Sequence, residues 1–267
     1  MHPFFAAARP LVFAHRGGAA LAPENTIAAF DNGLGLGADG LELDVHLSLD
    51  GQVVVHHDPT LDRTTDRRGD IAAFTADELA RVDAGCRFGR GDDRPFRGQG
   101  HGIPTLAVVL ARYRDHRIVI EMKVNRAELA RAVVDAVRAA GAVDRVCLGS
   151  FGLGVLRTAR ELEPAIATSA AREEVRWALY RSWCRWPIRS AAHGGFQVPE
   201  ISGSTRVVSR RFVADAHRAG LGVQVWTVDT EAAARILLGW GVDGLITNRP
   251  DVMVPLVRGQ MRGEARC

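Results

Sequence analysis

Short runs of apolar residues alternate along the chain with longer segments in which apolar positions recur every three or four residues. The first run, residues 11–14, leads to a turn signal at residues 23–25 and then to helical periodicity over residues 26–36. A short apolar run bounded by turn residues is typical of a buried strand, whereas the longer recurrence is typical of a helix that buries one side. The pattern therefore predicts a strand followed by a helix.

The second predicted strand, residues 40–45, is followed by something other than a helix. The dipeptide Asp50-Gly51 is a hairpin turn signal, and the apolar residues after it predict a short return strand. Residues 85–102 are rich in Gly, Arg and Asp without periodicity, which is typical of a surface loop. We therefore expect a hairpin and loop insertion over approximately residues 45–104.

From residue 104 onward the alternation of strand and helix patterns resumes. The expected strands are 118–121, 146–148, 165–168, 196–198, 223–226 and 244–247, and the expected helices are 104–113, 127–140, 153–162, 173–182, 209–219 and 230–240. Sustained βα alternation requires a parallel sheet, and eight main strands predict a (β/α)8 barrel, the TIM barrel, as a single α/β domain over residues 1–267. A doubly wound open sheet is the alternative.

Composition excludes several classes of protein. Apolar residues make up 47% of the 267 residues and charged residues 24%, which is ordinary for a globular protein. The net charge of +3 is small beside 34 basic and 31 acidic side chains, so we expect no nucleic-acid partner. No apolar run approaches the roughly 18 residues of a transmembrane segment, and the first residues do not resemble a secretion signal. A cytoplasmic protein is therefore expected.

Acidic residues lie where a barrel would gather them, at the C-terminal ends of its strands. Glu42 and Asp44 are two positions apart on one predicted strand, so their side chains point to the same face. Glu121 ends the neighbouring strand. If that face is the barrel interior, three carboxylates would need compensation, and a hard divalent ion, Mg²⁺ or Ca²⁺, is the economical partner. The alternative is that these acids face outward.

Basic side chains accompany the acids. His15 and His57 are candidate proton carriers, because an imidazole gives and takes protons near neutral pH. Strand alternation sends one of His56 and His57 inward without deciding which. Arg16 and Lys123 are candidate phosphate ligands, since a guanidinium matches phosphate oxygens bidentately and an ammonium acts as a point charge.

Taken together, these segments resemble the glycerophosphodiester phosphodiesterase family, and its bacterial cytoplasmic members in particular. The resemblance runs in order from residue 11 to residue 250, and it is most specific in the first sixty-odd residues. The segments that carry it are Ala14-His15-Arg16-Gly17-Gly18, Pro23-Glu24-Asn25-Thr26, residues 37–45 and residues 57–65, with weaker matches at residues 103–106, 121–123, 225–228 and 241–250.

The resemblance implies a function and a set of roles. It implies metal-dependent hydrolysis of glycerophosphodiesters to sn-glycerol 3-phosphate and an alcohol. One divalent ion would be held by Glu42, Asp44 and Glu121, and Trp226 would line the substrate channel.

The resemblance also assigns the basic residues. His15 and His57 would perform general acid/base catalysis, and His57 is favoured over His56 because the family's histidine directly precedes Asp-Pro. Arg16 and Lys123 would hold the phosphate of a small phosphodiester substrate. Which histidine is the acid, and what the oligomeric state is, stay open.

The resemblance gives little guidance between the predicted strands 165–168 and 196–198, where arginines and tryptophans interleave over residues 172–189. Such a segment would suit a membrane interface or the tail of a lysolipid. We favour an ordinary barrel helix with a solvated basic face and buried tryptophans. The residues are Trp177, Trp183, Trp186, Arg172, Arg176, Arg181, Arg185 and Arg189.

Two other functions stay open on the same barrel. One is a lysophospholipase D that acts on lysophospholipids. The other is a catalytically silent binding module, because a fold does not by itself imply a function.

Overall fold

Eight parallel strands form the centre of the molecule, in a computed structural model that describes residues 1–188 and 192–264, with only the backbone for residues 260–264. Neighbouring strands follow the order β6, β5, β4, β2, β1, β11, β10 and β7. Their bounds are β1 Leu11–His15, β2 Gly40–Leu47, β4 Arg117–Met122, β5 Val146–Gly149, β6 Ala167–Thr168, β7 Gly195–Pro199, β10 Gly222–Trp226 and β11 Gly244–Thr247.

The two end strands of this order meet and nearly close the ring. Ser169, just after β6, forms a parallel bridge with Gly195 of β7. The Ala170 amide donates to the Gly195 carbonyl at 3.0 Å, and the Gly194 amide donates to the Thr168 carbonyl at 2.9 Å. The predicted barrel is therefore confirmed, and the open doubly wound sheet is excluded.

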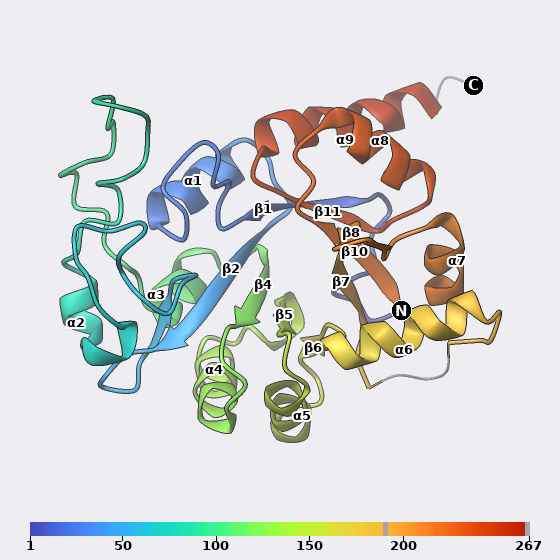
Figure 1. Cartoon of the computed structure of the whole chain (residues 1–267), viewed down its shortest axis with the longest axis horizontal. Helices are drawn as coiled ribbons and strands as arrows, with labels where there is room; N and C mark the ends of the chain where they lie inside the picture. The colour runs from blue at the N-terminus through green and yellow to red at the C-terminus, as the bar shows by residue number, and fades with distance from the viewer. Residues whose placement is uncertain (189–191, 265–267) are drawn as a thin grey trace.

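Helices surround the strands (Figure 1). Several begin where a Ser or Thr side chain accepts a hydrogen bond from the first turn, as Thr26, Thr105, Ser209 and Thr230 do. At these four positions a side chain therefore marks where the loop turns into a helix. The helices are α1 Ile27–Gly35, α3 Leu106–Arg112, α4 Ala127–Ala139, α5 Leu153–Leu162, α6 Arg172–Trp183, α7 Arg210–Arg218, α8 Glu231–Gly239 and α9 Pro250–Glu264, with a 3-10 turn η2 at Val143–Arg145.

The insertion after β2 is present as expected. The short strand β3 (Val53–Val55) pairs antiparallel with β2, and it is followed by the 3-10 turn η1 (Ile71–Ala73) and by α2 (Ala76–Leu79). Leu61 and Ile103 are buried with these elements in a small separate core. The insertion projects from one side of the barrel (Figure 1).

A short hairpin and a C-terminal helix are among the elements that were not predicted. A small antiparallel hairpin, β8 (Ile201–Ser202) with β9 (Thr205–Arg206), stands between β7 and α7. The chain also continues after β11 into α9, which packs against β1 and β11. Within the residues that the structure describes, no helix is long and apolar enough to cross a membrane.

The barrel interior is filled by apolar side chains at the end away from the acids. Phe13, Val119 and Ile246 pack there together with Phe4 and Phe5, which precede β1. Phe4 and Phe5 are each only 1% exposed. The segment before β1 therefore seals this end of the barrel and leaves the opposite end for chemistry.

Candidate active site

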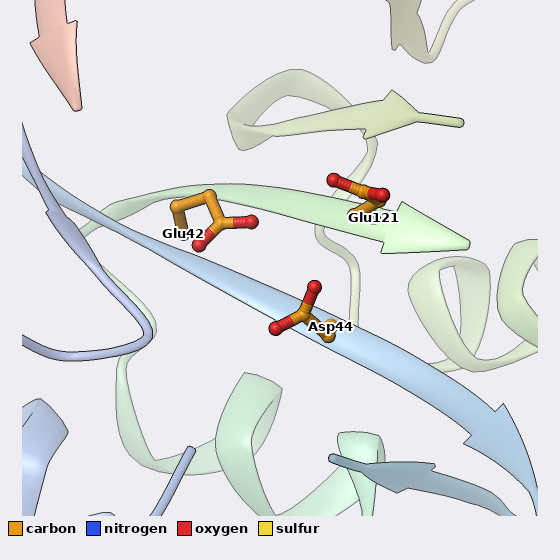
Figure 2. A group of neighbouring side chains, drawn as sticks. All are labelled: Glu42, Asp44 and Glu121. Carbon is orange, nitrogen blue, oxygen red and sulfur yellow. The ribbon is translucent and has the colours of Figure 1, made fainter. Parts of the chain in front are cut away.

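Three carboxyl groups meet inside the barrel at the C-terminal ends of its strands. Glu42 and Asp44 come from β2, and Glu121 lies opposite Asp44 on β4. One oxygen from each lies within 4.8 Å of the others. Figure 2 shows these three side chains gathered over the two neighbouring strands. Glu42 and Asp44 are buried, so the outward-facing alternative is excluded for this pair.

The protonation equilibria of these acids reflect their crowding. Burial, reinforced by the charges of Asp44 and Glu121, raises the pKa of Glu42 well above its ordinary value. Burial also raises the pKa of Glu121, although nearby Lys123 opposes the effect. Converging buried carboxylates are costly unless cations compensate them. A donor set made only of carboxylate oxygens fits a hard divalent ion such as Mg²⁺ or Ca²⁺.

Two basic side chains contact the acids. The Lys123 ammonium lies 3.2 Å from Asp44 Oδ1 and 3.3 Å from Glu121 Oε1. Although burial opposes protonation, these two carboxylates raise the pKa of Lys123. The Arg16 Nε lies 3.3 Å from Asp44 Oδ2, and the Arg16 amide donates to Glu42 Oε2 at 3.1 Å. The site therefore keeps positive charge beside its carboxylates.

His15 ends β1 and is held through its Nδ1. That atom lies 2.7 Å from Asn248 Oδ1, and Asn248 Nδ2 in turn donates to Asp229 Oδ2 at 2.8 Å. Because the amide oxygen only accepts, Nδ1 of His15 carries the hydrogen. Its Nε2 lies 3.8 Å from Glu42 Oε2. Burial, with a contribution from Arg16, lowers the pKa of His15 and favours the neutral ring.

His57, which follows β3 in the insertion, lines the same cavity. Its Nδ1 lies 2.6 Å from Asp58 Oδ1, and Asp58 Oδ2 accepts from Arg63 Nε at 2.6 Å. His56 differs, because it is buried with its Nε2 3.2 Å from the Thr60 carbonyl and does not line the cavity. Of the two neighbouring histidines, His57 is therefore the one that lines the cavity.

The cavity has a volume of about 560 Å³ and a mixed lining. The acids, the histidines, Arg16 and Lys123 all line it. Apolar side chains line it as well, including Val175 and Leu179 of α6, Val198 of β7 and Val207. Trp226 also lines the cavity, in edge-to-face contact with Phe151. Every predicted site residue therefore lines this one cavity.

Sequence reasoning missed the residues that hold these groups in place. Glu24 Oε1 accepts from Arg16 NH1 at 2.9 Å, and Asn25 Nδ2 donates to Asp44 Oδ2 at 2.9 Å. Glu24 also pairs with Arg63. These three lie inside the segments that carried the family resemblance, which was the available signal.

Comparisons with known proteins agree with this geometry. The model of the "Glycerophosphoryl diester phosphodiesterase family" matches residues 15–252. The chain therefore belongs to this family and is an enzyme that hydrolyses phosphoric diesters.

Two relatives match almost the whole chain. This chain is 31% identical over 260 residues to the glycerophosphodiester phosphodiesterase of Caldanaerobacter subterraneus subsp. tengcongensis, and the match covers 94% of this chain and 98% of the relative. This chain is also 32% identical over 260 residues to the glycerophosphodiester phosphodiesterase of Bacillus altitudinis, and that match covers 94% of this chain and 99% of the relative.

Solved structures share the barrel. A phosphodiesterase of Oleispira antarctica in complex with the product sn-glycerol-3-phosphate superimposes with a TM-score of 0.74 at 26% identity, over 94% of this chain and 97% of that one. A glycerophosphoryl diester phosphodiesterase domain from Mycobacterium tuberculosis gives a TM-score of 0.81 at 22% identity, over 95% and 99%, which supports the fold alone.

Proposed function

We propose that this enzyme hydrolyses glycerophosphodiesters to sn-glycerol 3-phosphate and an alcohol, with the help of one divalent ion. The observation that carries the proposal is that three carboxylates, two cationic side chains and two imidazoles line a single cavity. The related Oleispira antarctica structure, which contains sn-glycerol-3-phosphate as product, supports the same product here.

The phosphoryl group of the substrate would be held by charge. Glu42, Asp44 and Glu121 would hold one ion, Mg²⁺ or Ca²⁺, which when bound supplies positive charge to the phosphoryl oxygens. Arg16 and Lys123, already beside these carboxylates, would bind the remaining oxygens. Negative charge grows on these oxygens during hydrolysis, so preorganised cations lower the barrier.

The two histidines would move the protons. Each has its Nδ1 fixed by a hydrogen bond, His15 by Asn248 and His57 by Asp58, which leaves its Nε2 available to a substrate in the cavity. One ring accepts a proton from the nucleophile, which is water or the substrate's own glycerol hydroxyl, and the other donates a proton to the departing alkoxide. Attack by the glycerol hydroxyl would give a cyclic phosphate, which water then opens to sn-glycerol 3-phosphate. Trp226 would pack against the substrate in the same cavity.

The proposal is tested with purified enzyme stripped by a chelator and then given Mg²⁺ or Ca²⁺. Glycerophosphocholine, glycerophosphoethanolamine and a lysophospholipid are offered separately while products are identified. We expect sn-glycerol 3-phosphate from the first two, only after an ion is restored. Full activity after exhaustive chelation would remove the ion from the proposal.

A second candidate is hydrolysis of lysophospholipids by the same centre. It is favoured by the apolar part of the cavity lining, where Val175, Leu179, Val198 and Val207 offer a surface for an acyl chain. Product from the lysophospholipid alone would select this candidate. Product from none of the three substrates would instead favour the silent binding module.

A further inference from the structure

Four large aromatic side chains on and just after α6 are exposed to solvent. Trp177, Trp183 and Trp186 are 64%, 61% and 53% exposed, and Tyr180 is 48% exposed. The expectation of buried tryptophans was therefore wrong. The inward positions of α6 are instead filled by Ala178, Leu179 and Ser182, which leaves the larger rings outside.

These four rings form one surface, which we call the aromatic patch. The Tyr180 ring lies 6.0 Å from the ring of Trp177 and 6.0 Å from that of Trp186, both edge to face. Trp183 is one turn from Tyr180 on the same helix. Single exposed apolar residues are ordinary, but a contiguous exposed group marks a surface that binds something.

Positive charge surrounds the aromatic patch. Glu174 is held by Arg160, with 2.8 Å between Arg160 NH1 and Glu174 Oε1, so Glu173 is the exposed acid of α6. The arginines of this segment are Arg172, Arg176 and Arg185, all exposed, and Arg181, which is partly buried, whereas Arg189 lies outside the described residues. The patch is therefore both apolar and basic.

We propose that the aromatic patch docks this enzyme onto the surface of a membrane that contains anionic phospholipid. Indole and phenol rings settle at the boundary between headgroups and acyl chains, and arginines beside them attract anionic headgroups. One surface thus supplies both chemistries that the patch requires. The contact is peripheral, because none of the described helices could span a membrane.

The position of α6 links this docking to the cavity. The same helix that exposes Trp177 and Trp183 contributes Arg176, Val175 and Leu179 to the cavity lining. A membrane bound at the patch would therefore lie against the helix that forms one wall of the cavity. Neither of the two tryptophans lines the cavity, so docking and hydrolysis are separable by mutation.

The test uses the purified full chain and sedimentation with vesicles of phosphatidylcholine alone or mixed with phosphatidylglycerol. We expect the wild-type protein to sediment with the mixed vesicles, less so at high salt, and to show a blue shift in tryptophan emission. The affinity of the double variant Trp177→Ser/Trp183→Ser for the mixed vesicles should be lower by on the order of tenfold. Its hydrolysis of a water-soluble diester should match wild type.

The matched control is Ile236→Ser, which removes a 50% exposed apolar residue from α8 and should leave vesicle binding unchanged. Failure of the wild-type protein to bind the mixed vesicles would overturn the proposal. Equal binding by the double variant would do the same. So would a wild-type dimer that the double substitution dissociates, because the patch would then be a self-association surface. Binding is measured without substrate, so it stands apart from the proposed hydrolysis.

Discussion

In both His15 and His57 a hydrogen bond holds Nδ1, while Nε2 is left to contact a substrate. Replacing His15 or His57 with Ala removes a proton carrier, and we expect each change to lower kcat on glycerophosphocholine by on the order of 10²- to 10⁴-fold. Steady-state kinetics measures the loss, and circular dichroism checks the fold. The control is His217→Ala at an exposed position of α7, which should keep activity. Substantial turnover by either active-site variant would remove that histidine from its role.

Arg63 joins the two halves of the site without lining the cavity. It donates to Asp58, the partner of His57, and its NH1 and NH2 donate to Glu24 at 2.8 and 2.7 Å. Burial of Glu24 opposes ionisation, but Arg63 and Arg16 prevail and lower the pKa of Glu24 to about 2.

We therefore expect Arg63→Gln to lower kcat by about tenfold or more, because the partners of His57 and Arg16 lose their fixed positions. Full kinetic curves separate kcat from KM, and Arg63→Lys should recover part of the loss. The nearby exposed Arg68→Gln is the control. An unchanged kcat and pH profile in Arg63→Gln would show that Asp58 and Glu24 hold their places alone.

The groups placed in the cavity were predictable from sequence, whereas their supports were not. Glu42 and Asp44 follow from a two-residue spacing on one strand, and the neighbouring strand brings Glu121. The link from Asn248 to His15 joins residues 233 positions apart, and no local pattern encodes such a contact. Charge and spacing name the chemistry of a site, but tertiary packing decides which partner orients each group.

At the scale of elements, periodicity predicted every barrel strand to within a few residues. It failed for β8 and β9, which are as short as β6 but are not buried, and which therefore lack the apolar run that marks a barrel strand. It also failed for α9, because Pro255 interrupts the helical signal in the sequence. The folded chain nevertheless accommodates this proline within the helix. That the barrel and its insertion form a single domain stays a prediction.

The segment before β1 gives a stability prediction. The Phe5 ring occupies space that side chains at Gly195 and Gly222 would fill, since a Cβ at either would lie within 3 Å of Phe5 atoms. Phe5→Ala should lower the free energy of unfolding by about 3–5 kcal/mol by leaving a cavity. Chemical denaturation measures this loss. Leu36→Ala, at a 38% exposed position, should cost far less; equal losses would show that Phe5 is not a seal.

For the molecule as a whole, the pH dependence of stability can be tested at His193, which is not one of the active-site residues. Burial lowers the pKa of this ring from 6.5 to about 4, with Glu174 opposing and Arg160 reinforcing the shift. Between these two values the unfolded chain binds the additional proton, so acid favours unfolding. The wild-type protein should lose up to about 1.4 kcal/mol of stability per pH unit more than His193→Gln in this interval.

Denaturation of both proteins at several pH values gives the comparison. The two stability curves should run parallel above the ordinary histidine pKa and diverge below it. Curves that stay parallel down to pH 4 would show that His193 titrates alike in the folded and unfolded chains.

The pairing of β1 with β11 joins Leu11 to Gly244, residues from opposite ends of the sequence. During synthesis on the ribosome, one edge of β1 therefore stays unpaired until almost the entire chain has been made. The Phe5 ring also stays unpacked during this time, because Gly195 and Gly222, against which it packs, are made only with β7 and β10. Until then the growing polypeptide carries bare aromatic rings and an open strand edge, the features that chaperones bind.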